Sequence, residues 1–241
     1  MAASIQVLGV RVDALDTQAT LDRIGELLAG GGHHLVATVN PEFIMLARRN
    51  PEFHRVLDGA ALCLADGRGV TWAAARQGRP LPDRVTGVDL IPALAERAAR
   101  FRWRLFLLGA APGVAETVAD LLRAAHPGLV IAGCHAGVAG PEGDEESLRL
   151  IGAARPDIVL VAYGAPRQEF WIARNLARLE AGVGIGVGGA FDYLSGRVPR
   201  APAWMRRAGV EWLYRLLRQP WRAGRMAVLP LFAFEVLRAR T

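Results

Sequence analysis

Short apolar runs alternate with amphipathic stretches along most of the chain, and this alternation predicts its architecture. Runs typical of buried parallel strands occupy residues 5–10, 34–39, 60–65, 104–108, 129–132, 157–162 and 182–187. Helical spacing occupies residues 21–28, where Thr17 is the expected N-cap, and then 42–57, 70–76, 88–100, 114–125, 144–154 and 170–179. The pattern predicts an α/β fold, with a Rossmann-like, mostly parallel sheet and helices on both faces.

The charge pattern changes after residue 196. Residues 197–241 hold ten arginines and two acidic residues, whereas the preceding residues are nearly neutral. We therefore expect an α/β catalytic domain at residues 1–196 and an Arg/Trp-rich helical appendage at 197–241, broken near Pro220. The positive charge indicates an anionic partner, for which nucleic acid, a membrane surface and a diphosphate are the candidates. The apolar segment 226–234 is too short to span a bilayer, but it is suited to resting in the headgroup layer.

The composition excludes several kinds of chemistry. The chain has no lysine, so it has neither a Schiff-base lysine nor a P-loop. Its two cysteines are far apart, its histidines lack ligand spacing, and no Asp-x-Asp is present, so no metal site is expected. The glycines of residues 182–189 alternate inside a strand and do not open a helix, which disfavours a dinucleotide-dependent oxidoreductase. The start of the chain does not resemble a secretory signal, and a reducing cytosol is the expected compartment.

Small and polar residues follow the predicted strands, where ligands of parallel sheets bind. Asp66 is suited to act as a general base or to cap the next helix, and the residues alone favour neither reading. The other candidates also have two interpretations each. Thr38 and Asn40 suit either substrate binding or a strand followed by a turn, and Asp192 suits either a bond to a ribose or base or an Asx-turn. Gln168 and Glu169 suit either the binding of a sugar or base edge or the start of a helix. Gly109 and Gly137 would allow a ligand close to the backbone.

An ordered set of motifs runs through the chain. It comprises Thr38-Val-Asn40, Asp66-Gly67-x-Gly69, Arg84-Val-Thr-Gly87, Leu108-Gly109, Gly164-x-Pro-x-Gln168-Glu169, Val187-Gly-Gly-x-Phe-Asp192, Ser195-Gly196, Arg200-Ala-Pro and Glu211-Trp-Leu-Tyr-Arg215 with Pro220, Arg222 and Arg225. This set resembles the WecG/TagA/CpsF glycosyltransferases over almost the whole chain. One departure is Arg167, where the family usually has lysine, and it preserves the charge.

The resemblance implies an inverting, metal-independent enzyme of cell-surface polysaccharide or teichoic-acid synthesis. It would move a sugar, often N-acetylmannosamine, from a UDP-sugar to a polyprenyl-diphosphate-linked sugar at the cytoplasmic membrane face, without a cofactor. Asp66 matches the proposed base, Thr38 and Asn40 residues of the same site, and Gln168 and Asp192 the nucleotide-sugar pocket. Arg215, Arg222 and Arg225 match arginines brought to the diphosphates when the appendage closes, and Arg84 is counted with the substrate-binding residues.

One alternative from another class stays open at this point, a nucleic-acid-binding α/β protein that grips phosphates with the arginine tail. The polar strand ends and the apolar segment 226–234 weigh against it. The oligomeric state is open as well, because exposed apolar surface suits a second copy of the chain as well as a bilayer.

Overall fold

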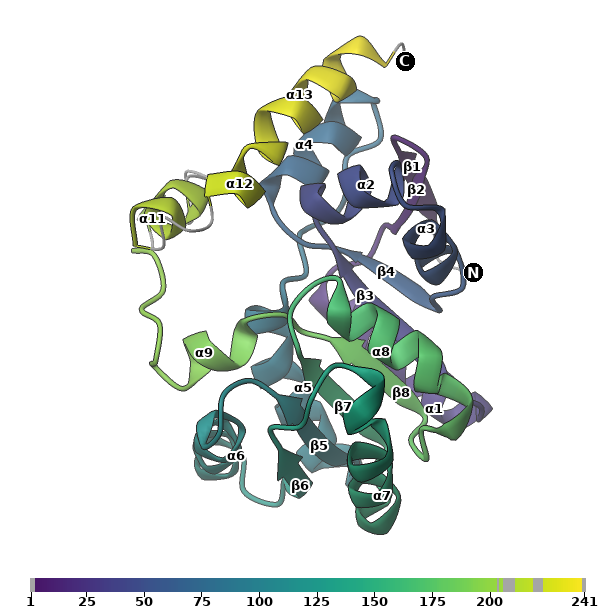
Figure 1. Cartoon of the computed structure of the whole chain (residues 1–241), viewed down its shortest axis with the longest axis vertical. Coiled ribbons are helices and arrows are strands. Elements are labelled where there is room, and N and C mark those ends of the chain that lie inside the picture. Colours follow the sequence, from purple (N-terminus) through teal and green to yellow (C-terminus); the bar gives the residue numbers. More distant parts are fainter. Residues whose placement is uncertain (1–2, 203, 206–210, 219–222, 240–241) are drawn as a thin grey trace.

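The computed structural model describes residues 3–202, 204–205, 211–218 and 223–239 (Figure 1). In this part of the chain, eight strands form one sheet in the order β1-β2-β4-β3-β8-β7-β5-β6. The strands are β1 (Ser4–Val7), β2 (Val10–Asp13), β3 (His34–Val39), β4 (Leu62–Ala65), β5 (Arg104–Gly109), β6 (Val130–His135), β7 (Ile158–Ala162) and β8 (Val183–Gly186). All neighbouring pairs are parallel except β1 and β2. The mostly parallel α/β sheet predicted from the sequence is confirmed.

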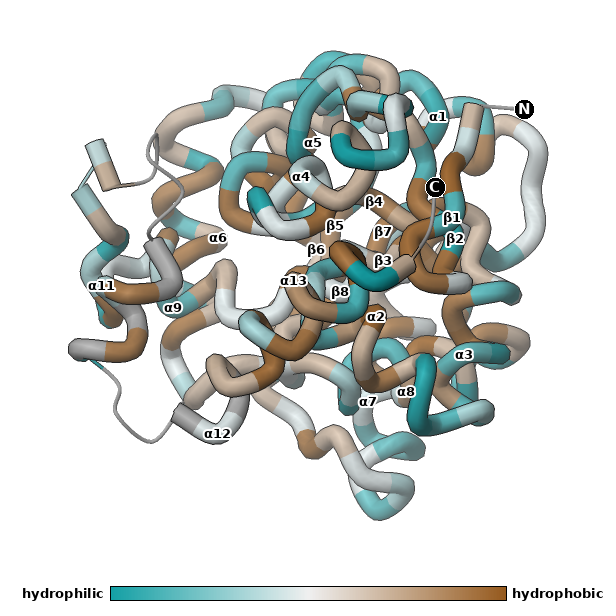
Figure 2. Tube along the Cα trace, turned by 90° about the horizontal axis from the view of Figure 1, so that it is seen from above, coloured by the Kyte–Doolittle hydropathy of each residue, from teal (hydrophilic) through white to brown (hydrophobic). Residues whose placement is uncertain are grey.

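Helices cover both faces of this sheet and enclose two apolar cores. One face carries α2 (Pro41–Ala47), α3 (Pro51–Asp58), α4 (Arg68–Arg76), α7 (Asp144–Ala154) and α8 (Arg167–Asn175). The other carries α1 (Thr17–Gly30), α5 (Gly87–Phe101), α6 (Val114–Ala125) and α9 (Ala190–Leu194). Short 3₁₀ turns occupy Pro141–Gly143 and Leu176–Arg178. Apolar residues concentrate in the central strands, as Figure 2 shows, because these strands are buried on both faces.

Two details at the start of the chain differ from the sequence prediction. Residues 5–10 were expected to form one strand, but Leu8 and Gly9 have positive φ and turn the chain into the β1–β2 hairpin. Such backbone angles suit a tight hairpin connection. The N-cap of α1 is Asp16, whose carboxylate accepts from the Ala19 N–H at 2.8 Å, and Thr17 is the first helical residue.

The alternating glycines of β8 let helix α8 approach the sheet. A Cβ atom at Gly184 would lie 2.8 Å from Ile172, and one at Gly186 would lie 2.3 Å from Glu169 Oε1. Both contacts are with α8, so these glycines serve helix–strand packing. The sequence reading that they do not form a phosphate-binding turn agrees with this arrangement.

From Glu211 onward the described part of the C-terminal appendage is mostly helical, with α11 (Glu211–Arg218), α12 (Ala223–Met226) and α13 (Val228–Arg238), whereas residues 197–202 are irregular. Helix α13 lies alongside α2 and α4 (Figure 1) and buries Phe232 and Val236, while Arg48 pairs with Glu235 at 2.9 Å. The expectation that all of segment 226–234 rests on a membrane is therefore wrong, since Met226 and Phe232 are buried in the protein. Within the described residues, none of the helices combines the length and apolarity that a bilayer crossing requires.

Candidate active site

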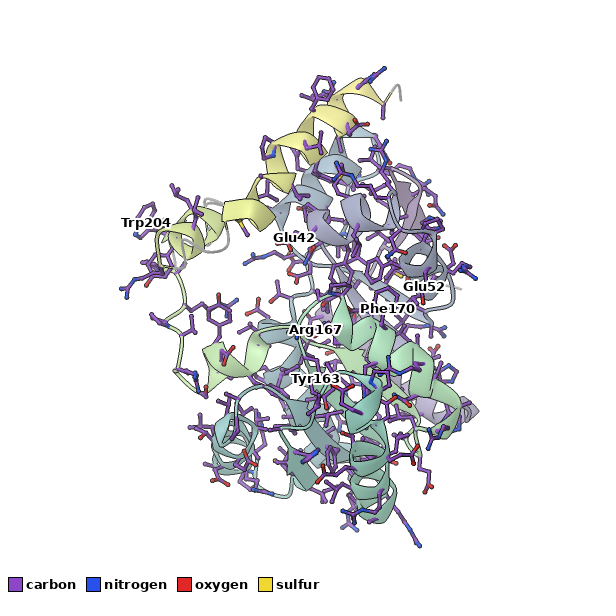
Figure 3. All side chains as sticks on the ribbon, viewed as in Figure 1. Glu42, Glu52, Tyr163, Arg167, Phe170 and Trp204 are labelled. Atoms are coloured by element: carbon purple, nitrogen blue, oxygen red, sulfur yellow. The ribbon has the colours of Figure 1, made fainter. Side chains whose placement is uncertain are left out.

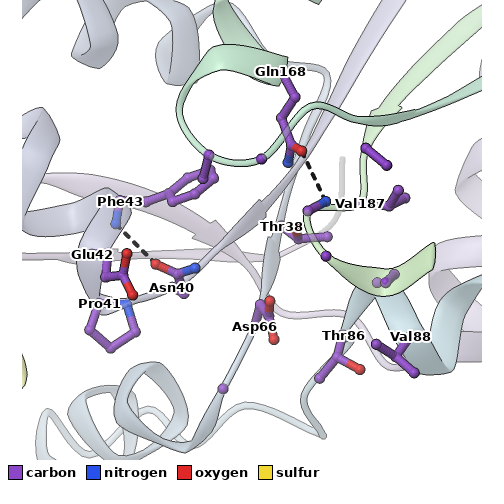
Figure 4. Close-up of a pocket in the computed structure, with 18 of the residues that line it drawn as sticks. Thr38, Asn40, Pro41, Glu42, Phe43, Asp66, Thr86, Val88, Gln168 and Val187 are labelled. Carbon is purple, nitrogen blue, oxygen red and sulfur yellow. Dashed lines mark hydrogen bonds between the residues drawn. The ribbon is translucent and has the colours of Figure 1, made fainter. Parts of the chain in front are cut away.

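A pocket of about 470 Å³ opens at the carboxyl ends of β3, β4, β7 and β8 (Figure 4). Loops after these strands and the first turns of the helices that follow supply most of its wall, and Arg200, Met226 and Leu229 contribute from the appendage. Its charged lining residues are Arg68, Arg84, Arg167, Arg200, Glu42, Asp66 and Asp192. Figure 3 places Glu42 on α2 and Arg167 at the start of α8. The site therefore combines carboxylates with guanidinium groups, a composition suited to a polar substrate that carries phosphates.

Asp66 is the first residue after β4, and its side chain lines the pocket. Its backbone N–H donates to the Val39 carbonyl at 2.8 Å, which fixes its position beside the end of β3. Helix α4 has Gly67 as its N-cap, at φ +94°, and no side chain caps it. The capping interpretation of Asp66 is therefore wrong, and the interpretation as a pocket carboxylate agrees with the geometry.

Thr38 and Asn40 lie at the end of β3, and both line the pocket. The Thr38 hydroxyl donates to the Gly186 carbonyl at 3.0 Å, which leaves its oxygen as an acceptor for a ligand. Asn40 Oδ1 accepts from the Phe43 N–H at 3.1 Å and caps α2. This cap uses the carbonyl end of the amide, so Nδ2 is the group that Asn40 can offer to a ligand.

Gln168 and Glu169 open helix α8 and have different surroundings. Gln168 lines the pocket and is fixed by two hydrogen bonds, because Nε2 donates to Glu169 Oε1 at 2.7 Å and Oε1 accepts from the Gly188 N–H at 2.9 Å. Glu169 is fully buried beneath it and does not line the pocket, contrary to the prediction that it binds substrate. Burial raises the pKa of the Glu169 carboxyl to about 7, since desolvation outweighs the bonds from Gln168 and the backbone.

Arg200 links the start of the appendage to the pocket rim. Its guanidinium forms a two-point ion pair with Asp89 on α5, at 2.8 and 3.0 Å, and the Thr86 hydroxyl donates to the same carboxylate at 2.8 Å. Burial alone would raise the pKa of Asp89, but the bonds from Arg200 and Thr86 outweigh it and hold the pKa below its usual value. The pair therefore anchors residue 200 against the body of the protein.

Two predicted glycine sites lie outside the pocket. Gly109 is at φ +100°, and a Cβ atom there would lie 2.8 Å from the Ala162 backbone. Gly137 is at φ +56°, and its Cβ atom would lie 2.2 Å from the Tyr163 hydroxyl. Close packing and a left-handed backbone require glycine at both positions, so the prediction of ligand contact is not supported there.

The three appendage arginines predicted to reach the diphosphates cannot be placed. Arg222 lies outside the described residues, and only the backbone of Arg215 and Arg225, in α11 and α12, is described. Among the residues that are described, no group of three or more His, Cys, Asp or Glu side chains has an arrangement able to hold a metal ion.

A family model for the "Glycosyl transferase WecG/TagA/CpsF family" matches residues 5–241. The chain belongs to this family. It is a glycosyltransferase, and its resemblance to the family is confirmed.

Two bacterial relatives are named N-acetylglucosaminyldiphosphoundecaprenol N-acetyl-beta-D-mannosaminyltransferase. The protein of Bacillus spizizenii is 37% identical over 203 residues, covering 84% of this chain and 78% of the relative. That of Staphylococcus aureus strain MW2 is 30% identical over 240 residues, covering 99% and 94%. The similarity thus extends through the appendage as well as the α/β body.

Sequence reasoning did not select several residues of this glycosyltransferase pocket. Glu42, Arg68 and Arg200 all line it, next to or inside motifs already used to identify the family. Their adjacency to Asn40 and Asp66, or to the Arg200-Ala-Pro motif, was the available signal. Met226 and Leu229 carried no such signal, because these apolar residues line the pocket only through the packing of α12 and α13.

Proposed function

We propose that the enzyme transfers an N-acetylmannosamine-type sugar from its UDP-sugar to polyprenyl-diphosphate-linked N-acetylglucosamine. The observation that carries this proposal is the Asp66 carboxylate in a pocket that four arginines also line. The printed names of the relatives support the sugar and the acceptor. The arginines support a donor with a diphosphate, because guanidinium groups pair with phosphate oxygens at two points.

Asp66 acts as the general base in this proposal. Its carboxylate removes the proton from the acceptor hydroxyl while that oxygen forms a bond to the anomeric carbon of the donor. The bond from the anomeric carbon to the phosphate oxygen breaks, and UDP leaves with its electron pair. Attack from the face opposite the leaving group inverts the anomeric centre. The Thr38 oxygen can accept a hydrogen bond from the same substrate region, since both residues end neighbouring strands.

The charge of the UDP leaving group is neutralised by arginine in this proposal, without a divalent metal. Arg68, Arg84 and Arg167 reach the pocket from three different elements of the chain, so a diphosphate could be held from several sides. Fixed cationic donors are effective in such a site because they need little reorganisation as charge develops. Arg215, Arg222 and Arg225 remain candidates for the same task, as the family resemblance implies.

The reaction takes place at the inner surface of the cell membrane in this proposal, where a polyprenyl acceptor resides. Helix α13 exposes Phe234 and Leu237, with exposed fractions of 58% and 55%, and α4, on which it packs, exposes Trp72. Exposed aromatic and aliphatic side chains beside a basic segment suit an anionic lipid surface. This peripheral contact replaces the wider contact expected for all of residues 226–234.

The direct test measures UDP release from UDP-N-acetylmannosamine with a short-chain polyprenyl-diphosphate-N-acetylglucosamine acceptor. We expect turnover that persists in EDTA and a product with the anomeric configuration opposite to the donor. UDP-N-acetylglucosamine serves as the matched donor control. Absence of turnover with every UDP-sugar, or product with retained configuration, would contradict the proposal, and loss of activity in EDTA would contradict the metal-independent step.

A further inference from the structure

The amide of Gln168 is held in one orientation by contacts at both ends. Its nitrogen donates to Glu169 Oε1 at 2.7 Å, and its oxygen accepts from the Gly188 N–H at 2.9 Å. An amide turned end for end would place an oxygen against the carboxylate and an N–H against the Gly188 N–H. The contact with the Gly188 N–H would be repulsive in either protonation state of Glu169, and the contact with Glu169 Oε1 would be repulsive whenever that oxygen carries no proton, so the two neighbours together select the orientation.

Glu169 occupies a space that is formed for its carboxyl group. It is fully buried in the first turn of α8, above Gly186 of β8. A Cβ atom at Gly186 would lie 2.3 Å from Glu169 Oε1 and 2.8 Å from Gln168 Nε2, so only glycine leaves room there. The Gly186 carbonyl also accepts from the Thr38 hydroxyl. The carboxyl therefore packs directly against the end of β8, whose Gly186 carbonyl is also bonded to the end of β3.

The stability of the fold gives no reason for a carboxyl group at this position. Among the described residues none donates to Glu169 Oε2, although this atom is buried. A buried polar atom without a partner destabilises the folded state, and an ionised one does so more strongly. Burial accordingly raises the pKa of the group to about 7. Among the side chains that the structure describes, its one hydrogen-bond partner is Gln168, a residue of the pocket.

We propose that Glu169 is a positioning residue, which orients the Gln168 amide toward the nucleotide sugar. The two bonds use one of the two amide N–H groups and one of the two lone pairs of the oxygen. The remaining N–H and lone pair are fixed in direction and can pair with a ligand that has both a donor and an acceptor. The identity of this ligand rests on the proposed function, whereas the orientation of the amide does not.

The test compares Glu169→Leu, which removes the acceptor, with Glu169→Gln, which keeps an oxygen for Gln168. Asn175→Leu is the matched control, because Asn175 is another buried polar residue of α8 that lies away from the pocket. Two quantities are measured on the full chain, namely hydrogen exchange of the Gln168 side-chain amide by NMR and the Kd for UDP. Gln18, which donates to the exposed Asp22 carboxylate at 3.1 Å, provides an internal reference for exchange of a solvated amide.

We expect the Gln168 amide protons of the wild type to exchange much more slowly than those of Gln18. Glu169→Leu should accelerate that exchange and raise the Kd for UDP about tenfold, as expected for the loss of one oriented hydrogen bond. Glu169→Gln should restore both quantities, and Asn175→Leu should change neither. Slow exchange retained in Glu169→Leu, or a Gln variant as impaired as the Leu variant, would overturn the proposal. If Glu169→Leu fails to fold, the wild type alone still tests the proposal. Exchange of the Gln168 side-chain amide as fast as that of Gln18 would overturn it. A wild type with a protected Gln168 amide and no affinity for UDP would instead contradict the proposed function alone.

Discussion

The ends of β3, β4, β7 and β8 enclose a pocket of about 470 Å³, whereas the ends of β5 and β6, along the same edge of the sheet, contribute no residue to it. Both halves carry glycines with positive φ after their strands. The chain moves outward from β3 to β4, crosses to β5 on the other side, and returns to place β8 beside β3. The pocket lies at this reversal of strand order, where ligands of open α/β sheets bind. Glycine after a strand therefore indicates a ligand only where the topology also opens a crevice.

The largest effect is expected at Asp66, the proposed general base, in the half of the sheet that carries the pocket. Asp66→Asn should lower kcat by about 10²–10⁴-fold, the range for loss of a general base, while stability changes little. Steady-state kinetics and thermal unfolding on the same preparation check both parts. Asp192→Asn is the matched control, since it removes another pocket carboxylate and should raise the KM for the donor more than it lowers kcat. Equal losses of kcat in the two variants would contradict the assignment of Asp66.

The next effect concerns the pH dependence of stability, which the buried Glu169 beneath the pocket should cause. Because the pKa of Glu169 is about 7 in the folded state, the native protein holds this proton when the unfolded chain has lost it. Wild-type stability should therefore fall as the pH rises from about 4.5 to 7, by about 3 kcal/mol from this group. Glu169→Gln should remove this dependence and be the more stable protein at pH 8. Urea unfolding at pH 5 and pH 8 measures the free energy of unfolding of both proteins. An equal change between the two pH values in wild type and variant would contradict the expectation.

A smaller effect is expected from the half without a pocket. Gly137→Ala places a methyl group against the Tyr163 hydroxyl at a left-handed backbone position. The free energy of unfolding should fall by about 2 kcal/mol, from backbone strain and overpacking together. Under conditions where the variant is folded, its KM for the donor should stay within about threefold of the wild type. A large rise in KM without loss of stability would show that substrate extends to the end of β6.

The smallest effect is expected at the junction of body and appendage. Asp89→Asn weakens the ion pair with Arg200, which is partly exposed to solvent, so the loss of stability should stay below about 1 kcal/mol. High salt should reduce the difference further, because it screens the pair in the wild type. Urea unfolding at low and high ionic strength measures both values. A loss of stability that does not depend on salt would indicate that the hydrogen bond from Thr86, and not the charge of Asp89, stabilises the contact between body and appendage.

The periodicity of the sequence was sufficient to predict the sheet and most helices, because strands buried on both faces have continuous apolar runs. It was not sufficient at glycines, because a glycine can serve a turn or close packing as well as a ligand contact. Leu8-Gly9 makes a hairpin that the apolar run conceals, and Gly137 serves packing where a ligand was expected. Six of the predicted residues do line one pocket, because each lies near the end of a strand or in a loop on the side of the reversal: Thr38, Asn40, Asp66, Arg84, Gln168 and Asp192.

The depth of Glu169 could not be predicted, since the sequence places an acid in the first turn of a helix in either case. The docking of α13 was also not predictable from its composition. An apolar segment beside arginines has the same pattern whether it faces lipid or packs on α2 and α4. Only the structure shows that the segment packs on the protein. At Gly69 of α4, for example, a Cβ atom would lie 2.7 Å from Pro41 of α2 and 3.6 Å from Phe232 of α13.

The contribution of Met226 and Leu229 to the pocket has a consequence for the order of synthesis. A chain that has left the ribosome as far as Ala201 already contains all eight strands of the sheet, together with Asp66 and Gln168. It still lacks Met226 and Leu229, the lining residues that are translated after the rest of the site. We expect a nascent or prematurely terminated chain to fold its body without becoming an active transferase, so that the activity begins only with α12 and α13.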